Sequence, residues 1–262
     1  MLNMNYFFIN LSPSPIMYTI MLFFFLNCLN NFFWKIQNYL MVLILIFSFF
    51  FFLFYKNFSM MSNENNLMGF FTWKKKKIIS NGFIMFIISE MMVFISLFWS
   101  YIHNAFSPNI FMGNFWPPKG IIPSNPTSMI IFGTSILLSS SFIIMISHNY
   151  MIEKNYKFKT LLNFLFCLIM GLMFIDMQIL EMSNFYMKLN FNFNDSIFSS
   201  SFILTTSLHA SHVILGLMAL FHSFILLLNN NMNIYNYLSF EFSIWYWHFV
   251  DYIWIVVFSL FY

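Results

Sequence analysis

The chain alternates between long apolar runs and short polar breaks. A membrane-spanning helix needs about 20 mostly apolar residues, and clusters of Pro, Asn or Ser between such runs are typical of loops. The pattern predicts seven spans, at residues 16–33, 39–55, 78–103, 127–150, 158–182, 196–228 and 240–258. We therefore expect an all-α membrane protein with seven transmembrane helices.

A polar segment separates the first two spans from the other five. It carries Asn63-Glu64-Asn65-Asn66 and ends in four consecutive lysines. The expected organisation is an N-terminal lead with two helices at 1–62, a polar basic linker at 63–77 and a bundle of five helices at 78–262.

Composition and charge narrow the class further. Residues of the hydrophobic types make up 60% of the chain and charged residues 7%, which is too few polar groups to coat a soluble globule. Eleven lysines and no arginine stand against eight acidic residues, and this weak, scattered balance argues against a nucleic-acid surface. If the helices alternate in direction, eight lysines fall on one side and three on the other, so the positive-inside rule places the N-terminus inside and the C-terminus outside.

The last span carries polar groups that are unusual in a membrane helix. Glu241, Trp245, His248 and Tyr252 recur at i, i+4, i+7 and i+11 and share one helix face, and Asp251 lies one turn beyond His248. Charged groups in hydrocarbon cost several kcal/mol, on the order of 3 or more. This face is therefore expected to contact protein rather than lipid.

Glu90 lies about twelve residues into its span, or about 18 Å along a helix that crosses roughly 30 Å of hydrocarbon. This position is near the middle of the membrane. Two interpretations remain open: a protonatable group on a proton pathway, or a neutral, hydrogen-bonded carboxyl between helices.

The histidines form only a weak metal-binding pattern. His209 and His212 are spaced i, i+3 on one face, but no acidic residue or cysteine lies within a turn of them. His103, His148 and His248 are each alone on their spans, and Cys28 and Cys167 are far apart. Polar packing is favoured over metal binding. Gln178 and Glu181, near the end of the fifth span, are expected to be solvated at the membrane surface or to reach it with extended side chains.

Taken together, the motifs are similar to those of a known family. They include Ser89-Glu90 followed by Phe98-Trp99 and His103, then Trp116-Pro117-Pro118-x-Gly120-Ile121, Asn125-Pro126 and His148. They continue with Gln178-x-x-Glu181, His209-x-x-His212-Val213-x-x-Gly216 and Phe240-Glu241 leading into Trp245-Tyr246-Trp247-His248-Phe249-Val250-Asp251. From about residue 69 to its end, the chain resembles cytochrome c oxidase subunit III.

The resemblance implies two N-terminal helices separated by a lipid-filled cleft from a five-helix bundle. It also implies a non-redox role, because family members bind no haem or copper: haem a and copper belong to partner subunits I and II. The implied partners are these two subunits, further complex IV subunits and membrane lipids, with cytochrome c as substrate of the complex. The implied location is the mitochondrial inner membrane, with the N-terminus in the matrix and the C-terminus in the intermembrane space.

The resemblance also assigns expected roles to residues. Glu90 matches the family's intramembrane carboxylate, linked to proton uptake. The candidates for the polar bundle and the lipid cleft are His103, His148, Gln178, Glu181, His209, His212, Glu241, His248 and Asp251. Family positions for lipid headgroups are changed here, and Lys74, Lys75, Lys76 and Lys77 are the candidates to replace them. Rival interpretations are a stand-alone seven-helix receptor or transporter, and a membrane enzyme with its own metal at His209 and His212.

Overall fold

The structure is a computed structural model. It describes residues 73–108, 114–118, 129–153, 157–189, 195–229 and 237–262, together with residue 193 and residues 16, 17, 19, 20, 23, 24, 26 and 27. The chain divides into two compact units, Met1–Lys76 and Lys77–Tyr262. In the first unit, the eight described residues between 16 and 27 are helical and fall within the first predicted span. The second predicted span lies outside the described residues.

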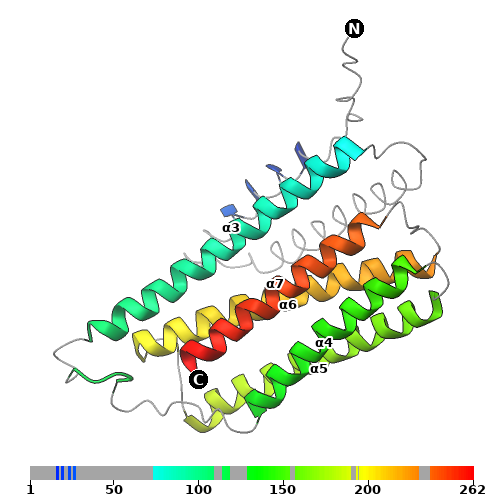
Figure 1. Ribbon diagram of the computed structural model, residues 1–262. Coiled ribbons are helices and arrows are strands. Elements are labelled where there is room, and N and C mark those ends of the chain that lie inside the picture. Colours follow the sequence, from blue (N-terminus) through cyan, green and yellow to red (C-terminus); the bar gives the residue numbers. More distant parts are fainter. Residues whose placement is uncertain are drawn as a thin grey trace. The chain divides into compact units, whose positions relative to one another are not determined.

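Five long helices follow (Figure 1). They are α3 (Trp73–Phe106), α4 (Met129–Ile152), α5 (Lys157–Leu189), α6 (Ile197–Leu228) and α7 (Leu238–Phe261). All five are long and apolar enough to cross a membrane. The predicted class of helical membrane protein is therefore confirmed, and these helices correspond to the third to seventh predicted spans.

The helices extend past most of the limits that hydropathy predicts. The lysines at 74–77, expected in a linker, lie in the first turns of α3, and α5 continues to Leu189 rather than ending at residue 182. Hydropathy measures the length of the apolar run, whereas a helix continues for as long as its backbone hydrogen bonds can form. Polar ends of this kind extend into the interfacial region beyond the hydrocarbon.

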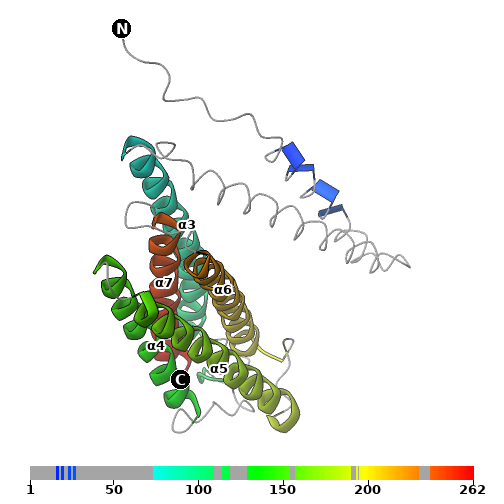
Figure 2. The ribbon, with the colours of Figure 1, turned by 90° about the vertical axis from the view of Figure 1, so that its right-hand side faces the viewer.

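Four helices form a closed ring. In chain order α4 packs on α5, α5 on α6 and α6 on α7, and α7 closes the ring on α4 (Figure 2). Helix α3 packs outside this ring through aromatic side chains. The rings of Phe83 and Phe242 on α7 stack with centroids 4.5 Å apart, and Tyr101 meets Phe261 at 4.3 Å. Offset aromatic pairs of this kind add about 1 kcal/mol to the packing.

Trp247 of α7 fills the centre of the ring. Its side chain is completely buried, and its indole Nε1 donates a hydrogen bond to Ser140 Oγ of α4 at 3.0 Å. Gly171 of α5 and Gly216 of α6 leave space for the indole: a Cβ at either position would come within 3.0 Å of a Trp247 ring atom. Small residues at such contacts let membrane helices approach closely.

Hydroxyl groups in these apolar helices form hydrogen bonds with backbone groups of the same helix. Ser139, Ser140 and Ser141 each donate to the backbone carbonyl three residues earlier, at 2.6–2.8 Å. At the start of α6, Ser196 and Ser199 form a capping box, in which each side chain accepts from the other's backbone N–H at 3.0 Å. A cap of this kind satisfies amide groups that the first turn leaves without helical partners.

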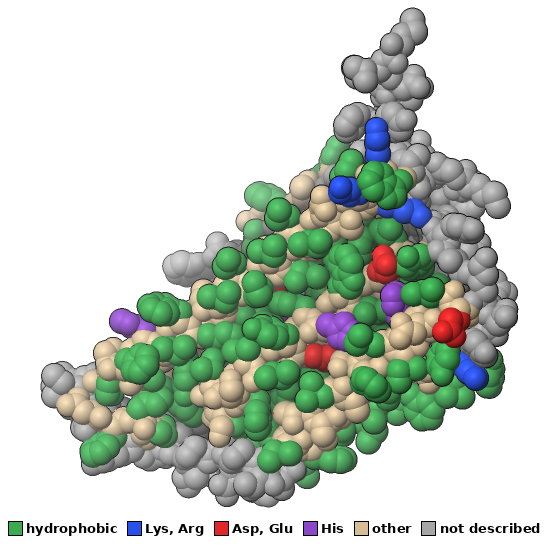
Figure 3. Space-filling view, in the orientation of Figure 1, with side chains coloured by type: hydrophobic (Ala, Val, Ile, Leu, Met, Phe, Trp, Pro, Cys, Tyr) green, Lys and Arg blue, Asp and Glu red, His purple; other side chains and the backbone are tan. Residues whose placement is uncertain are grey.

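Hydrophobic side chains cover most of the face of the helices seen in Figure 3. Large residues such as Met85, Trp99 and Phe142 are more than half exposed on the chain. A soluble monomer rarely exposes apolar patches of this extent. The surface fits contact with lipid or with other membrane subunits.

Candidate functional site

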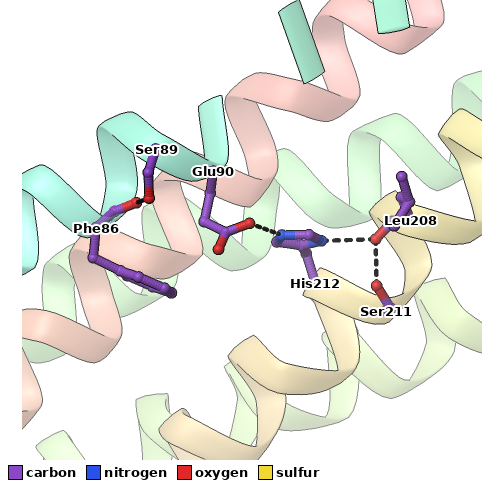
Figure 4. Close-up of polar contacts among 6 residues, drawn as sticks. All are labelled: Phe86, Ser89, Glu90, Leu208, Ser211 and His212. Carbon is purple, nitrogen blue, oxygen red and sulfur yellow. Dashed lines mark hydrogen bonds and ion pairs between the residues drawn. The ribbon is translucent and has the colours of Figure 1, made fainter. Parts of the chain in front are cut away.

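A carboxyl and an imidazole meet between α3 and α6 (Figure 4). Glu90 Oε2 and His212 Nε2 are 3.0 Å apart. Glu90 lies 17 residues after Trp73 in a helix of 34 residues, and His212 lies 15 residues after Ile197 in a helix of 32. Both groups are therefore at the middle of their helices, at the depth where an unpaired charge is most costly.

The backbone fixes the tautomer of the imidazole. His212 Nδ1 lies 2.8 Å from the carbonyl oxygen of Leu208, which also accepts from Ser211 Oγ at 2.6 Å (Figure 4). A carbonyl oxygen can only accept, so Nδ1 carries a proton. The contact between Nε2 and Oε2 then requires one further proton, held either by the imidazole as an ion pair or by the carboxyl as a neutral pair. In both cases the pair shares one proton.

Aromatic rings enclose the imidazole. The ring centroid of Phe94 lies 5.1 Å from that of His212, and the rings of Tyr246 and Phe249 on α7 lie at 6.4 and 6.3 Å. The His212 side chain is 11% exposed, while that of Glu90 is 28% exposed. The low-dielectric surroundings strengthen the hydrogen bond. Glu90 is therefore the more exposed member of the pair in this chain.

His209 does not join this pair. It is completely buried, and its Nε2 lies 3.3 Å from the carbonyl oxygen of Val250 on α7. The polar contacts of the i, i+3 histidines therefore go to different helices, that of His212 to α3 and that of His209 to α7. Within the described residues, no three His, Cys, Asp or Glu side chains come together in a metal-binding group.

The polar groups of α7 are arranged differently from the expected pattern. Asp251 is buried, and its Oδ2 lies 3.8 Å from His248 Nδ1. The predicted stripe itself lies at the surface of this chain: Tyr252 is 60% and Trp245 37% exposed, and Glu241 is half-buried. The helical spacing is correct, but within this chain the opposite face is the one that packs, because it presents the large rings of Trp247 and Trp254.

The polar groups expected at the end of the fifth span lie 11 and 8 residues before the end of α5. Gln178 is buried rather than solvated, and Glu181 accepts a 2.7 Å hydrogen bond from the Tyr262 hydroxyl. Tyr262 lies just beyond α7, where burial and the neighbouring Glu181 carboxyl hold its pKa well above the usual value of 10.0. The expectation of a solvated group is wrong for Gln178, whereas Glu181 is half-buried and its carboxyl contacts Tyr262.

The remaining candidates lie apart from the Glu90–His212 pair. His103 is exposed in the last turn of α3, and the His148 ring lies 5.8 Å from that of Phe240. Lys74 and Lys77 are exposed and Lys76 half-buried at the start of α3; the side chain of Lys75 is outside the described residues. No contact in the described part of the chain brings these groups to Glu90.

Sequence alone does not reveal the pairing of Glu90 with His212. The two residues are 122 positions apart. The one available indication is that each lies at mid-helix and needs a partner. The roles of Leu208, whose carbonyl orients the imidazole, and of Tyr262 are likewise absent from any motif.

These features define a helical, multi-pass membrane protein with a proton-sharing pair between two of its helices. The family model described as cytochrome c oxidase subunit III matches residues 4–262. Among curated relatives, the cytochrome c oxidase subunit 3 of Rhipicephalus sanguineus is 37% identical over 77% of each chain. That of Drosophila melanogaster is 34% identical over 77% of this chain and 75% of its own. That of Schizophyllum commune is 37% identical over 76% and 72%.

The chain belongs to the cytochrome c oxidase subunit III family. It is therefore a subunit of an oxidoreductase complex that contains other subunits.

Proposed function

We propose that this chain is a non-redox core subunit of the cytochrome c oxidase of the mitochondrial inner membrane. In this proposal it stabilises the catalytic subunit, holds phospholipid and supports proton uptake while the complex reduces oxygen to water and pumps protons. The observation that carries the proton role is the Glu90–His212 pair, which shares one proton at mid-membrane depth.

The geometry supports a proton reservoir rather than an inert anchor. The carboxyl is the more exposed partner, and the imidazole is hydrogen-bonded to Leu208 and surrounded by aromatic rings. A proton that arrives at Glu90 is stabilised by the hydrogen bond between Oε2 and His212 Nε2. The pair can then release it through the same exposed carboxyl, which makes it suited to buffering a proton supply.

The structural role is supported by polar side chains of α7 that remain partly exposed in this chain alone. The half-buried Glu241 and the partly exposed His248 on α7 are better matched by a protein neighbour than by lipid. Subunit I is the proposed neighbour. Haem a and copper are assigned to subunits I and II, and cytochrome c is the electron donor of the complex.

The arrangement in the membrane is part of the proposal. It comprises seven transmembrane helices, a lipid-filled cleft between the first two and the other five, an N-terminus in the matrix and a C-terminus in the intermembrane space. The lysines at 74–77 are proposed to hold lipid headgroups at the start of α3. Their replacement by Gln should lower the amount of co-purified phospholipid, and an unchanged amount would contradict this role.

The first experiment captures the chain from gently solubilised native membranes. An a-type haem spectrum with cytochrome c-driven oxygen uptake would support the proposal, with the haem on partner chains. A lone chain without haem would contradict it.

The second experiment separates proton exchange from packing at Glu90. Glu90→Gln keeps a hydrogen bond, because an amide N–H can donate to neutral His212 Nε2, but it removes the titratable carboxyl. Glu90→Ala removes both. We expect both variants to assemble and both to show slower proton uptake or a shorter lifetime under turnover. If Glu90→Gln matches the wild type in pumping, oxygen reduction and lifetime, the pair is an anchor and the proton role is wrong.

A further inference from the structure

Three polar groups inside the helix ring have no hydrogen-bond partner among the described residues. They are Nδ1 of His209 on α6 and, on α7, the carboxyl of Asp251 and the indole Nε1 of Trp254. Each of these residues is at most 5% exposed. Buried polar groups in proteins are nearly always paired, either with protein or with ordered water. A partner for these three groups is therefore expected inside the ring.

The three groups lie along one turn of α7. Asp251 and Trp254 are spaced i, i+3 and share a face of that helix. The ring centroids of His209 and Trp254 are 5.1 Å apart, and His209 Nε2 lies 3.3 Å from the carbonyl oxygen of Val250, the residue before Asp251. A water molecule that makes two hydrogen bonds of about 2.9 Å joins atoms up to about 6 Å apart. One or two molecules can therefore connect the three groups.

The contact with Val250 decides the role of each ring nitrogen of His209. A carbonyl oxygen only accepts, so Nε2 carries a proton. No carboxylate in the described part of the chain forms an ion pair with His209. An isolated cation is too costly to bury, so the ring is neutral. In a neutral imidazole with its proton on Nε2, Nδ1 is an acceptor.

The neighbours of Asp251 do not satisfy its oxygens. His248 Nδ1 is 3.8 Å from Oδ2, which is beyond hydrogen-bond distance. Ser141 of α4 lies near the carboxyl, but its hydroxyl donates to the carbonyl oxygen of Leu138 at 2.7 Å. With or without a proton on the carboxyl, at least one of its oxygens is available to accept.

The three groups match the hydrogen-bonding capacity of water. Trp254 Nε1 only donates, whereas His209 Nδ1 and the Asp251 carboxyl accept. A cation would face the indole N–H, and an anion would face the carboxyl. A water molecule has two donors and two acceptor sites, and a buried one typically makes about three hydrogen bonds. It can accept from Trp254 and donate to the other two groups.

We propose that His209, Asp251 and Trp254 form an internal site that binds one or two ordered water molecules between α6 and α7. The ring of Phe174 on α5 forms an apolar wall beside it, with its centroid 5.1 Å from that of Trp254 and 6.1 Å from that of His209. All three polar residues are buried within this chain, so the site needs no group from another subunit. It depends neither on lipid nor on proton exchange at Glu90.

A cryo-electron microscopy map of the purified oxidase complex, at a resolution that shows ordered water, tests the site directly. Density for water is expected at hydrogen-bond distance from Trp254 Nε1 and from His209 Nδ1. Waters resolved elsewhere in the same map serve as the internal control. Absence of density at Trp254 in a map that resolves those waters would overturn the proposal.

Radiolytic hydroxyl labelling of the complex in lipid nanodiscs gives a second measurement. X-rays convert water to hydroxyl radicals, which modify the side chains next to that water, and mass spectrometry locates the modified residues. Trp254 should be labelled several times more than Trp247, although both indoles are almost completely buried. Trp247 is the matched control, because its Nε1 already donates to Ser140. Equal labelling of the two tryptophans would contradict a water site at Trp254.

Variants identify the groups that hold the water. His209→Phe and Asp251→Leu each remove an acceptor and should lower the labelling of Trp254 severalfold. His103→Phe is the control, because it removes an exposed imidazole in the last turn of α3. An equal decrease in the control, or no decrease in either test variant, would refute the assignment. If neither test variant assembles, the comparison of Trp254 with Trp247 in the unmodified complex decides.

Discussion

Gly171→Ala tests whether the indole of Trp247 sets the packing of the helix ring. A Cβ built at residue 171 would lie 2.5 Å from Leu217 Cδ2 and 2.9 Å from Trp247 Cη2. Leu217 ends in a flexible isobutyl group that can rotate away. Trp247 cannot, because it is completely buried and hydrogen-bonded to Ser140. The methyl group must therefore displace the indole or spread α5 from α7.

The expected change in stability for Gly171→Ala is the sum of two opposing contributions. Overpacking a filled core costs about 1–3 kcal/mol, and replacing Gly by Ala in a helix recovers up to about 1 kcal/mol. With the full recovery, the net loss of stability is about 0–2 kcal/mol, or up to about 8 °C in the midpoint of thermal unfolding. The measurement is the temperature at which the purified complex loses this subunit.

Two other helical glycines provide controls. At Gly133 the added Cβ would meet its nearest atoms at 3.7 Å, an ordinary contact, and at Gly82 it would meet nothing within 4 Å. Alanine at either position should leave the midpoint unchanged or raise it. The loss in Gly171→Ala should also shrink in a Trp247→Phe background, where Cη2 is absent. A midpoint for Gly171→Ala at or above that of Gly133→Ala would refute the reasoning.

Three further changes test single hydrogen bonds. Ser140→Ala leaves the Trp247 Nε1 without its acceptor and should cost about 1–3 kcal/mol of stability. Tyr262→Phe removes the donor to Glu181 and should cost about 1–2 kcal/mol. Because the folded pKa of Tyr262 is raised, this contribution is full below pH 10 and is lost as the pH rises through the folded value. Ser196→Ala removes the cap of α6 and should cost about 1 kcal/mol.

Each of these changes has a neighbour that serves as its control. Ser139→Ala removes a hydroxyl that bonds within its own helix, and Tyr252→Phe removes an exposed phenol. Ser200→Ala alters α6 one residue after the capping box. Thermal unfolding of the complex measures all six variants. If a control variant loses as much stability as its matched test variant, the hydrogen bond between helices or at the cap does not explain the loss.

The helices were predictable from the sequence to within a few residues at most ends. The span predicted at 196–228 is observed as α6 (Ile197–Leu228), and that at 240–258 as α7 (Leu238–Phe261). A spanning helix needs an apolar run that matches the thickness of the membrane, and the length of such a run is visible in the sequence. The polar turns at the start of α3 were missed because lysines continue a helix without adding hydrophobicity.

The face of α7 that packs could not be predicted in the same way. In a membrane, lipid and protein are both apolar, so hydropathy does not distinguish the side that meets other helices. Trp247 packs inward because Gly171 and Gly216 leave space for it on two other helices. The partner of Glu90 could not be predicted either, because hydropathy does not show how α3 lies against α6.

The proton shared by Glu90 and His212 is nearly insensitive to the membrane potential. One elementary charge that crosses the whole membrane changes energy by about 2.3 kcal/mol per 100 mV. The two heavy atoms are only 3.0 Å apart, which is about a tenth of the roughly 30 Å of hydrocarbon. Even if the proton moved parallel to the field, the free energy of its transfer would therefore change by only about 0.2 kcal/mol per 100 mV. The balance between ion pair and neutral pair is set by local chemistry and stays almost constant as the membrane becomes energised.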